Sequence, residues 1–314
     1  MTTSPPITVM DDGGAHLENQ ARHVTIPAGV ELTTPVRLAI VGMSGSVAES
    51  RHVLRAMAGS KGMIVLDHRG SGTLEQTVEI EVGDGAQLTV IAVHDGERDA
   101  VHTASHQARV SRDATLRHTV VSFGGAQVSI TPTVVFCGPG GDAELLGLNL
   151  TDTGQKHEAR IAIDHAAPRC RSRVTYKGAL SGAGAHSVWV GDVLIRKNAE
   201  GTDTYELNRH LMLTRGARVD SVPNLEIETG QIEGAGHASA TGRFDGEQLF
   251  YLRSRGIDEA SARRLVVRGF FAELLDKIPV PDLAKRLADQ VDARLAGEGR
   301  HRPALSVTKK ESHA

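Results

Sequence analysis

Short apolar runs separated by Gly, Asp and Asn dominate the chain over residues 31–244. The stretches VEIEVGDGAQLTVIAV, ARVSRDATLRHTVVSF and VVFCGPGGDAELLGLNL each place a polar or glycine-containing turn between two alternating segments. Alternation of apolar and polar residues is typical of β-strands, and Gly and Asp supply the tight turns between them. The pattern therefore predicts a mainly β fold built from strand, turn and strand.

The turns recur at a nearly constant spacing. Each is followed by Ala-x-Leu, and the leucines Leu88, Leu116 and Leu145 recur at about 28 residues, within the range of solenoid repeats. A strand repeat of this length predicts a solenoid, because one coil cannot bury its apolar face alone while stacked coils share a core. We expect the three leucines to form one interior column. A β-sandwich is the alternative, but its turns would come about every 8–12 residues.

The period changes to a helical one at Asp245. Asp258 is placed as a helix N-cap, and Gly256 as the stop of the helix before it. The next segment is apolar at helical spacing, and after two prolines the segment DLAKRLADQVDARL is predicted to be a further helix. We therefore expect a polar segment over residues 1–30, a small α-helical domain over residues 245–296 and a disordered tail over residues 297–314. The apolar stripe of this domain includes Val267, Phe270, Phe271, Leu274, Leu275 and Ile278.

Composition narrows the class of protein. Aromatic residues make up only 3% of the chain and there are 34 glycines, which fits a layered core of small and β-branched side chains. The net charge of −3 argues against a nucleic-acid binder, which would carry a basic stripe. We read no signal peptide and no apolar run long enough to span a bilayer, and so expect a cytoplasmic protein with no membrane partner.

Two motifs offer chemistry before residue 200. HTASH places His102 and His106 four residues apart, a spacing that can hold a metal ion on a helix. Because the segment lies between predicted strands and carries no acidic third ligand, we favour a solvated pair of histidines. In DHAAPRC, the residues Asp164, His165 and Cys170 offer a carboxylate, an imidazole and a thiol, and the arginines nearby could lower the thiol pKa. We favour a buried structural cysteine beside an Asp–His hydrogen bond.

The third candidate is His237, the one large polar side chain in the small-residue stretch GAGHASATG. Small neighbours allow another backbone to come close. An imidazole there could face a partner subunit or bind a metal such as iron. A polar cap on the end of the solenoid is the alternative, and the residues alone leave both open.

The segments DHAAPRCRSRVTYKGAL and NLEIETGQIEGAGHASATGRFDGEQLFYLRSRGIDEASARRLVVRGFFAELLDKI resemble the SufB/SufD family of iron–sulfur cluster assembly subunits. The resemblance implies a right-handed parallel β-helix with a C-terminal helical domain. It also implies that SufB-like and SufD-like subunits pair through their β-helices, and that the helical domain docks the ABC-type ATPase SufC, here through Phe270, Phe271 and Leu274. His237 falls on the SufD histidine near which the cluster forms, and so would be a transient metal ligand. No cofactor is expected to be stably bound to the chain alone.

Within the resemblance, the sequence favours a non-catalytic, SufD-like subunit. Asn208 stands where SufB carries its functional Cys, and Ala238 stands where SufB has an acidic residue. A SufB-like scaffold is the first alternative. A β-helix carbohydrate-active enzyme is the second, but such an enzyme usually has aromatic platforms for sugars, and Trp189 is the single Trp of the chain.

Overall fold

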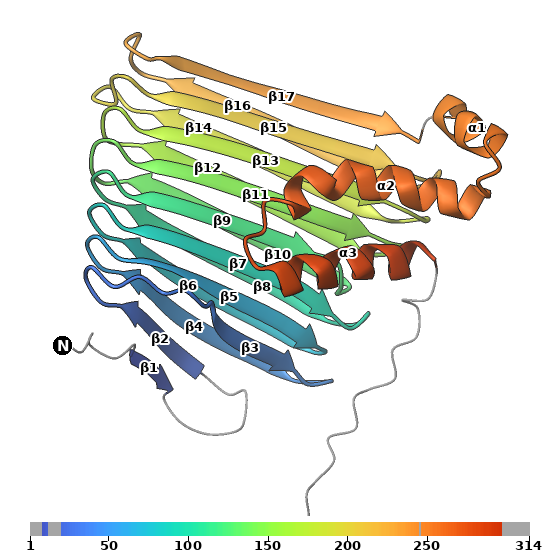
Figure 1. Ribbon diagram of the computed structural model, residues 1–314, viewed down its shortest axis with the longest axis horizontal. Coiled ribbons are helices and arrows are strands. Elements are labelled where there is room, and N and C mark those ends of the chain that lie inside the picture. The colour runs from blue at the N-terminus through green and yellow to red at the C-terminus, as the bar shows by residue number, and fades with distance from the viewer. Residues whose placement is uncertain (1–7, 12–19, 245, 297–314) are drawn as a thin grey trace, which may run out of the picture. The chain divides into compact units, whose positions relative to one another are not determined.

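The computed structural model describes residues 8–11, 20–244 and 246–296. It divides after Phe244 into two compact units. Within the described residues the first unit contains the strands and the second contains the helices (Figure 1). The tail expected to be disordered, residues 297–314, lies outside the described residues, as does most of the polar segment expected over residues 1–30.

The strands form two sheets whose members alternate along the chain, so the chain passes from one sheet to the other in each half-coil. The first sheet consists, in spatial order, of β1 (Thr8–Asp11), β2 (Gln20–Ile26), β4 (Val47–Ala56), β6 (Thr73–Val82), β8 (Val101–Val110), β10 (Gln127–Phe136), β12 (Lys156–His165), β14 (His186–Ile195) and β16 (Arg218–Ile227).

The second sheet runs in the same direction along the stack, and the colours of Figure 1 follow it from blue to orange. It consists of β3 (Val36–Gly42), β5 (Lys61–Gly70), β7 (Gln87–Gly96), β9 (Thr115–Ser122), β11 (Asp142–Thr151), β13 (Arg171–Leu180), β15 (Asp203–Met212) and β17 (Gly234–Arg243).

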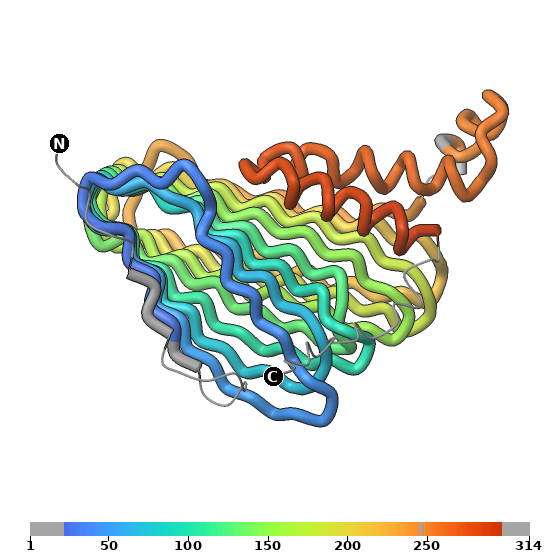
Figure 2. The backbone as a smooth tube through the Cα atoms, turned by 60° about the horizontal axis from the view of Figure 1, so that its bottom comes forward, coloured from blue at the N-terminus to red at the C-terminus, as the bar shows by residue number. Residues whose placement is uncertain are grey.

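All pairings except the one between β1 and β2 are parallel, which confirms the predicted parallel β-helix. Figure 2 shows successive coils following almost the same path. The parallel stack includes β2 and therefore starts before residue 31, the boundary expected from the sequence. The short runs become strands because turn residues end each one. At Gly85 the turn requires φ of +63°, a value that L side chains rarely adopt.

The predicted leucine column is only partly correct. Leu88 does pair with Leu116 in the next coil. Leu116 then pairs with Ala143, whereas Leu145 pairs with His118, two positions farther along the strand. All three leucines are buried in one core cluster. The register slips because the coil length is not constant.

The length of a coil varies along the stack. Arg55 pairs with Glu81 early in the stack, and Asp192 pairs with Asn224 late in it, where the two partners are farther apart in the sequence. The extra residues lie in the turns between strands, since the strands themselves keep the same length. A fixed repeat length therefore cannot assign every interior column.

The second unit contains the three helices that the sequence predicts: α1 (Gly246–Ser254), α2 (Glu259–Leu275) and α3 (Pro281–Leu295). The Asp258 side chain caps α2 by accepting a hydrogen bond from the Ser261 backbone N–H, as expected. The first residue of α3 is Pro281, whose fixed φ suits the start of a helix. Of the helices that the structure describes, none has both the length and the apolar character needed to cross a lipid bilayer.

Candidate functional site

The last coil of the solenoid carries His237 on β17, the end strand of the second sheet in the described residues. His237 pairs with Glu206 of β15, one coil earlier. Ala235, two residues before it on the same face, packs against the interior core cluster. His237 therefore lies in an inward-facing column, yet its side chain is exposed because no further coil covers it. The imidazole stands at the open end of the stack.

The small residues around His237 are explained by this position. The glycine before it, Gly236, lies against the ring of Tyr205, so that an added Cβ would be 3.4 Å from the ring. The remainder of β17 is Ala, Ser, Thr and Gly, and most of it is exposed. The strand thus presents backbone and one imidazole, with little side-chain bulk in the way of an approaching partner.

Glu206, directly below His237 in the column, is buried, and neither carboxylate oxygen has a hydrogen-bond partner among the described residues. Burial, assisted by the negative charge of Asp192, raises the pKa of Glu206 to about 7. Room for the carboxyl group exists because Gly191 lacks a side chain, and a Cβ there would collide with Glu206 and Trp189. A carboxyl group that titrates near neutral pH next to an exposed imidazole is a feature of functional sites.

Sequence reasoning missed Glu206. The signal was present in the strand TYELNRHLM, where Glu206 occupies an alternating inward position one coil before His237. Finding it required the correct coil length at this point of the stack, which the register of β15 and β17 gives.

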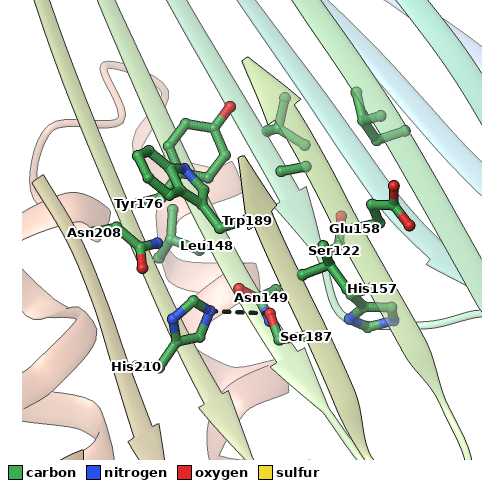
Figure 3. Close-up of a pocket in the computed structure, with 14 residues that line it drawn as sticks. Ser122, Leu148, Asn149, His157, Glu158, Tyr176, Ser187, Trp189, Asn208 and His210 are labelled. Carbon is green, nitrogen blue, oxygen red and sulfur yellow. Dashed lines mark hydrogen bonds between the residues drawn. The ribbon is translucent and has the colours of Figure 1, made fainter. Parts of the chain in front are cut away.

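A cavity of about 20 Å³, lined by apolar residues and by several polar side chains, lies inside the preceding coils (Figure 3). The Ser187 hydroxyl is 2.9 Å from His210 Nε2, and Asn149 Nδ2 donates to the same hydroxyl over 3.1 Å. Asn208 Oδ1 accepts from the Ser221 hydroxyl. The volume is enough for a water molecule, which needs about 10–15 Å³ and several polar partners. Asn208 is therefore a buried hydrogen-bonding residue of this interior.

The interpretation of HTASH as a solvated pair of histidines is wrong, although its place among strands is confirmed. His102 and His106 both lie on β8 and are buried. Their side chains point into the coil interior, where His102 Nδ1 is 2.8 Å from His94 Nδ1 and His106 Nδ1 is 2.9 Å from His118 Nε2. A spacing of four residues places both side chains on the same face of a strand, just as it does on a helix.

Cys170 is a buried structural residue, as favoured from the sequence. Burial raises the pKa of its thiol, and this effect outweighs the positive charge of Arg169. The thiol donates weakly to the Gly138 carbonyl over 3.4 Å. The expected Asp–His hydrogen bond is replaced by two others: Asp164 binds the Arg196 guanidinium, and His165 Nε2 is 2.9 Å from the Ser172 hydroxyl. These residues hold successive coils together.

The helical unit buries much of the stripe that the sequence assigned to docking. Phe271 and Leu274 are fully buried, while Phe270 is half-buried. Fully buried side chains stabilise their own unit and offer no surface to a partner. The exposed large apolar side chains of the described part of this unit are instead Phe250, Tyr251 and Leu265. Helical periodicity marks an apolar face without showing what already covers it, so the assignment of this stripe to docking stays a prediction.

Curated proteins of known assignment are similar to this chain over most of its length. An iron–sulfur cluster assembly SufBD family protein of Mycobacterium bovis is 54% identical over 284 residues, covering 88% of this chain and 72% of that protein. The iron–sulfur cluster assembly protein SufD of Escherichia coli is 25% identical over 90% of this chain and 69% of its own length. SufD of Bacillus subtilis is 26% identical, with 90% and 65% covered.

A family model described as the SufBD core domain of SUF system FeS cluster assembly matches residues 39–270. The match covers more than half of the chain and includes β17 with His237. It confirms the family resemblance seen in the sequence and removes the reason to consider a carbohydrate-active enzyme. The chain therefore belongs to the SufBD family of the SUF system for iron–sulfur cluster assembly.

Proposed function

We propose that the chain is a SufD-like, non-catalytic scaffold subunit. It pairs with a SufB-like subunit through the open end of its β-helix, and it docks a SufC-like ABC ATPase through its helical unit. The observation that carries the proposal is the exposed, inward-column position of His237 on the end strand β17. The two SufD relatives and the absence of a Cys at Asn208 favour the SufD-like over the SufB-like role.

The free edge of β17 supplies a surface for pairing. In a parallel ladder the backbone groups of alternate residues point to the same neighbouring strand. The Gly234 N–H donates to the carbonyl of Thr202, the residue before β15, and the Phe244 N–H donates to the carbonyl of Met212, the last residue of β15. Even-numbered residues of β17 therefore face β15, and the N–H and C=O groups of Ala235, His237 and Ser239 point to the free edge. Unpaired edges of this kind accept a strand from another chain.

A partner strand on this edge would place a second chain beside His237. A neutral imidazole is a good iron ligand, and thiolates from the partner would complete a set suited to iron and sulfide. The nascent cluster is the cargo of this site, held only while it is assembled and passed on. Glu206, the buried acid below the imidazole, can hold or release a proton near neutral pH as charge builds up above it.

The proposed ATPase contact involves the exposed aromatic side chains of α1. Phe250 is 75% exposed and Tyr251 is 59% exposed. Exposed aromatic residues are enriched at the energetic centres of protein interfaces. Phe270, half-buried on α2, belongs to the same helical unit and is the one member of the predicted docking set that retains exposed surface.

The β17 edge is tested by Ser239→Pro. Proline removes the outward N–H and its ring occupies the free edge, while the bonds of the neighbouring even-numbered residues to β15 remain. Ser239→Ala is the matched control, because it removes the hydroxyl and keeps the N–H. Each variant is co-expressed with a SufB-like subunit and a SufC-like ATPase and analysed by size-exclusion chromatography.

We expect Ser239→Pro to lose the SufB-like subunit, keep the ATPase and retain its β circular dichroism, while Ser239→Ala elutes with both. A proline variant that still elutes with the SufB-like subunit at wild-type ratio would show that the edge is not the pairing surface. If the wild-type chain binds neither protein, the proposed function itself fails.

A further inference from the structure

Three imidazoles meet inside the solenoid, far along the chain from His237. His68 of β5 and His94 of β7 pair in successive coils, and their rings stack with centroids 4.5 Å apart. His102 of β8 lies across the corner from them, with its ring centroid 4.6 Å from each of the other two. One nitrogen from each of the three residues lies within 4.8 Å of the others. Two features of the backbone bring them together. His94 and His102 lie on the two strands that flank one corner of a coil, and the stacking of coils places His68 beside His94.

The hydrogen bonds of this cluster are incomplete. His94 Nδ1 and His102 Nδ1 are 2.8 Å apart, so one of them donates to the other. The Nε2 atoms of both rings are buried and have no hydrogen-bond partner in the described structure. A buried polar atom without a partner is unfavourable, and it calls for a water molecule, an ion or another ligand.

His68 has the surroundings of a metal ligand. Its Nδ1 is 3.1 Å from the Val93 carbonyl oxygen, and its Nε2 is 2.9 Å from Gln76 Oε1. When Nδ1–H donates to the carbonyl, the lone pair of Nε2 becomes available, and the Gln76 amide can rotate to accommodate a ligand. Metal-binding histidines almost always donate their second ring N–H to a backbone carbonyl, a carboxylate or a water molecule.

A small cavity adjoins the three rings. Its volume is about 40 Å³, and its walls include His68, His94, His102 and glycines of the corner such as Gly70 and Gly72. The space is sufficient for an ion with one water molecule, since a single water needs about 10–15 Å³. Among the described residues that line the cavity none is acidic. Arg69 also lines it, and its guanidinium is paired with Asp67. The candidate donor set therefore consists of imidazole nitrogens.

Burial favours the neutral form of these rings, which is the form that binds metals. It lowers the pKa of His68 to about 4, and it lowers the pKa values of His94 and His102 well below the usual range. Three positive imidazolium groups would repel one another and a metal ion.

We propose that His68, His94 and His102 form a binding site for one divalent first-row transition-metal ion, of which Zn²⁺ is the reference. Three imidazoles with a water molecule in the fourth position make a tetrahedral site. Zn–N bonds of about 2.0–2.1 Å place tetrahedral ligands about 3.3 Å apart, so small rotations of the His94 and His102 rings open the 2.8 Å contact between their Nδ1 atoms sufficiently for both Nδ1 atoms to be ligands. The Nε2 atom of each ring then carries the proton and is left for a water molecule. The site is independent of the interface proposed at His237.

The test uses the full chain, freed of metal by a chelator and then titrated with Zn²⁺ by calorimetry and with Co²⁺ by visible absorption. We expect one equivalent to bind, with the intense visible bands of four-coordinate Co²⁺ and without a thiolate charge-transfer band. His94→Gln should weaken binding at least tenfold. The matched control is His118→Gln, which alters a second buried imidazole contact two coils from His68 and should leave the affinity unchanged.

Three results would overturn the proposal: no saturable binding at one equivalent, a six-coordinate Co²⁺ spectrum, or equal loss of affinity in His118→Gln. X-ray absorption of the wild-type chain with one equivalent of Zn²⁺ provides a test that does not depend on the folding of a variant. Three imidazole nitrogens around the ion are expected, and fewer than three would contradict the assignment.

Discussion

The coils that are covered by a further coil, here called the closed coils, differ from the last coil of the solenoid in the burial of one inward-facing column of paired residues. In the closed coils the column contains Ile64, Val90 and Leu145, which are fully buried. Toward the end it passes to Glu206, still buried, and then to the exposed His237. Nothing about the strands themselves changes, because each keeps its length and its parallel pairing. The position in the stack alone turns a core site into a surface site.

This difference shows how a repeating fold acquires function. Imidazoles in the closed coils are buried, and some of them pair with one another, as His106 and His118 do. An imidazole in the last coil faces solvent or a partner. The closed coils therefore supply stability and an enclosed environment, and the end coil supplies the exposed surface on which the proposed pairing with a second subunit depends.

The largest expected contrast between the two regions is in their response to acid. Burial lowers the pKa values of His52, His118, His165 and His210 from 6.5 to about 4. Between these values the unfolded chain binds more protons than the folded chain, so the stability present above pH 6.5 is lost as the pH falls toward 4. Each such group contributes about 1.4 kcal/mol per pH unit. Together they predict a loss of several kcal/mol between pH 6.5 and 5.

Denaturant unfolding followed by circular dichroism at pH 7.5, 6.5 and 5 measures this loss. His165→Asn serves as the control, because removing one buried imidazole should reduce the slope below pH 6.5 by about 1.4 kcal/mol per pH unit. A free energy of unfolding that stays constant from pH 7.5 to 5 would mean that the interior imidazoles are solvated.

The loss of unfolding free energy on truncating an apolar side chain should also differ between the two regions, by less than the effect of acid. Leu116 is fully buried in the closed coils, whereas Ile227 on β16 is 45% exposed. Leu116→Ala should destabilise the protein by about 2–5 kcal/mol, because it removes apolar contacts and leaves a cavity. Ile227→Ala should cost less than about 1 kcal/mol. Equal losses in thermal or denaturant unfolding would contradict the description of the last coil as open.

The helical unit offers a third comparison, between exposed apolar residues that are proposed to bind a partner and those that are not. The double change Phe250→Ala and Tyr251→Ala should weaken SufC-like ATPase binding at least tenfold, or about 1.4 kcal/mol. Met43→Ala, a change at a 51% exposed residue of the solenoid, is the control and should have no effect. Calorimetric titration measures both. Unchanged affinity of the double variant would exclude α1 from the docking surface.

The smallest effect concerns the two thiols, which differ in reactivity and contribute little to stability. Cys137 is exposed and Cys170 is buried, with a raised pKa. A thiol reagent should modify one group per native chain rapidly and the second only after unfolding, since the thiolate is the reactive form. Cys137→Ser should abolish the rapid phase. Two rapid thiols in the native wild-type chain would show that the coil around Cys170 opens readily.

Much of the fold could be predicted from the sequence, because turn residues and alternation report on each coil locally. The register could not, since the coil length varies and Leu145 therefore stacks on His118 instead of Leu116. The same limit hid the proposed metal site. His68 and His94 belong to successive coils and each lies in an ordinary alternating strand, so their meeting depends on the exact length of one coil.

The candidate site was predictable at His237 and less so elsewhere. The small residues around His237 stand out in the sequence, and the structure shows why they are there. Glu206 could be recognised only from the stacking of two coils. The burial of Phe271 and Leu274 could not be predicted, because an amphipathic stripe does not show whether its apolar face is already covered.

The central claim is that the imidazole at the open end serves cluster assembly and does not merely cap the stack. The direct measurement is the iron and acid-labile sulfide content of the complex with SufB-like and SufC-like proteins, purified with wild-type chain, His237→Ala or Thr241→Ala. Thr241 is an exposed residue of β17 in the same inward-facing row, so it controls for a general disturbance of the strand. We predict that all three complexes assemble and that only His237→Ala loses most of its iron and sulfide. Wild-type amounts of both in the His237→Ala complex would contradict the account.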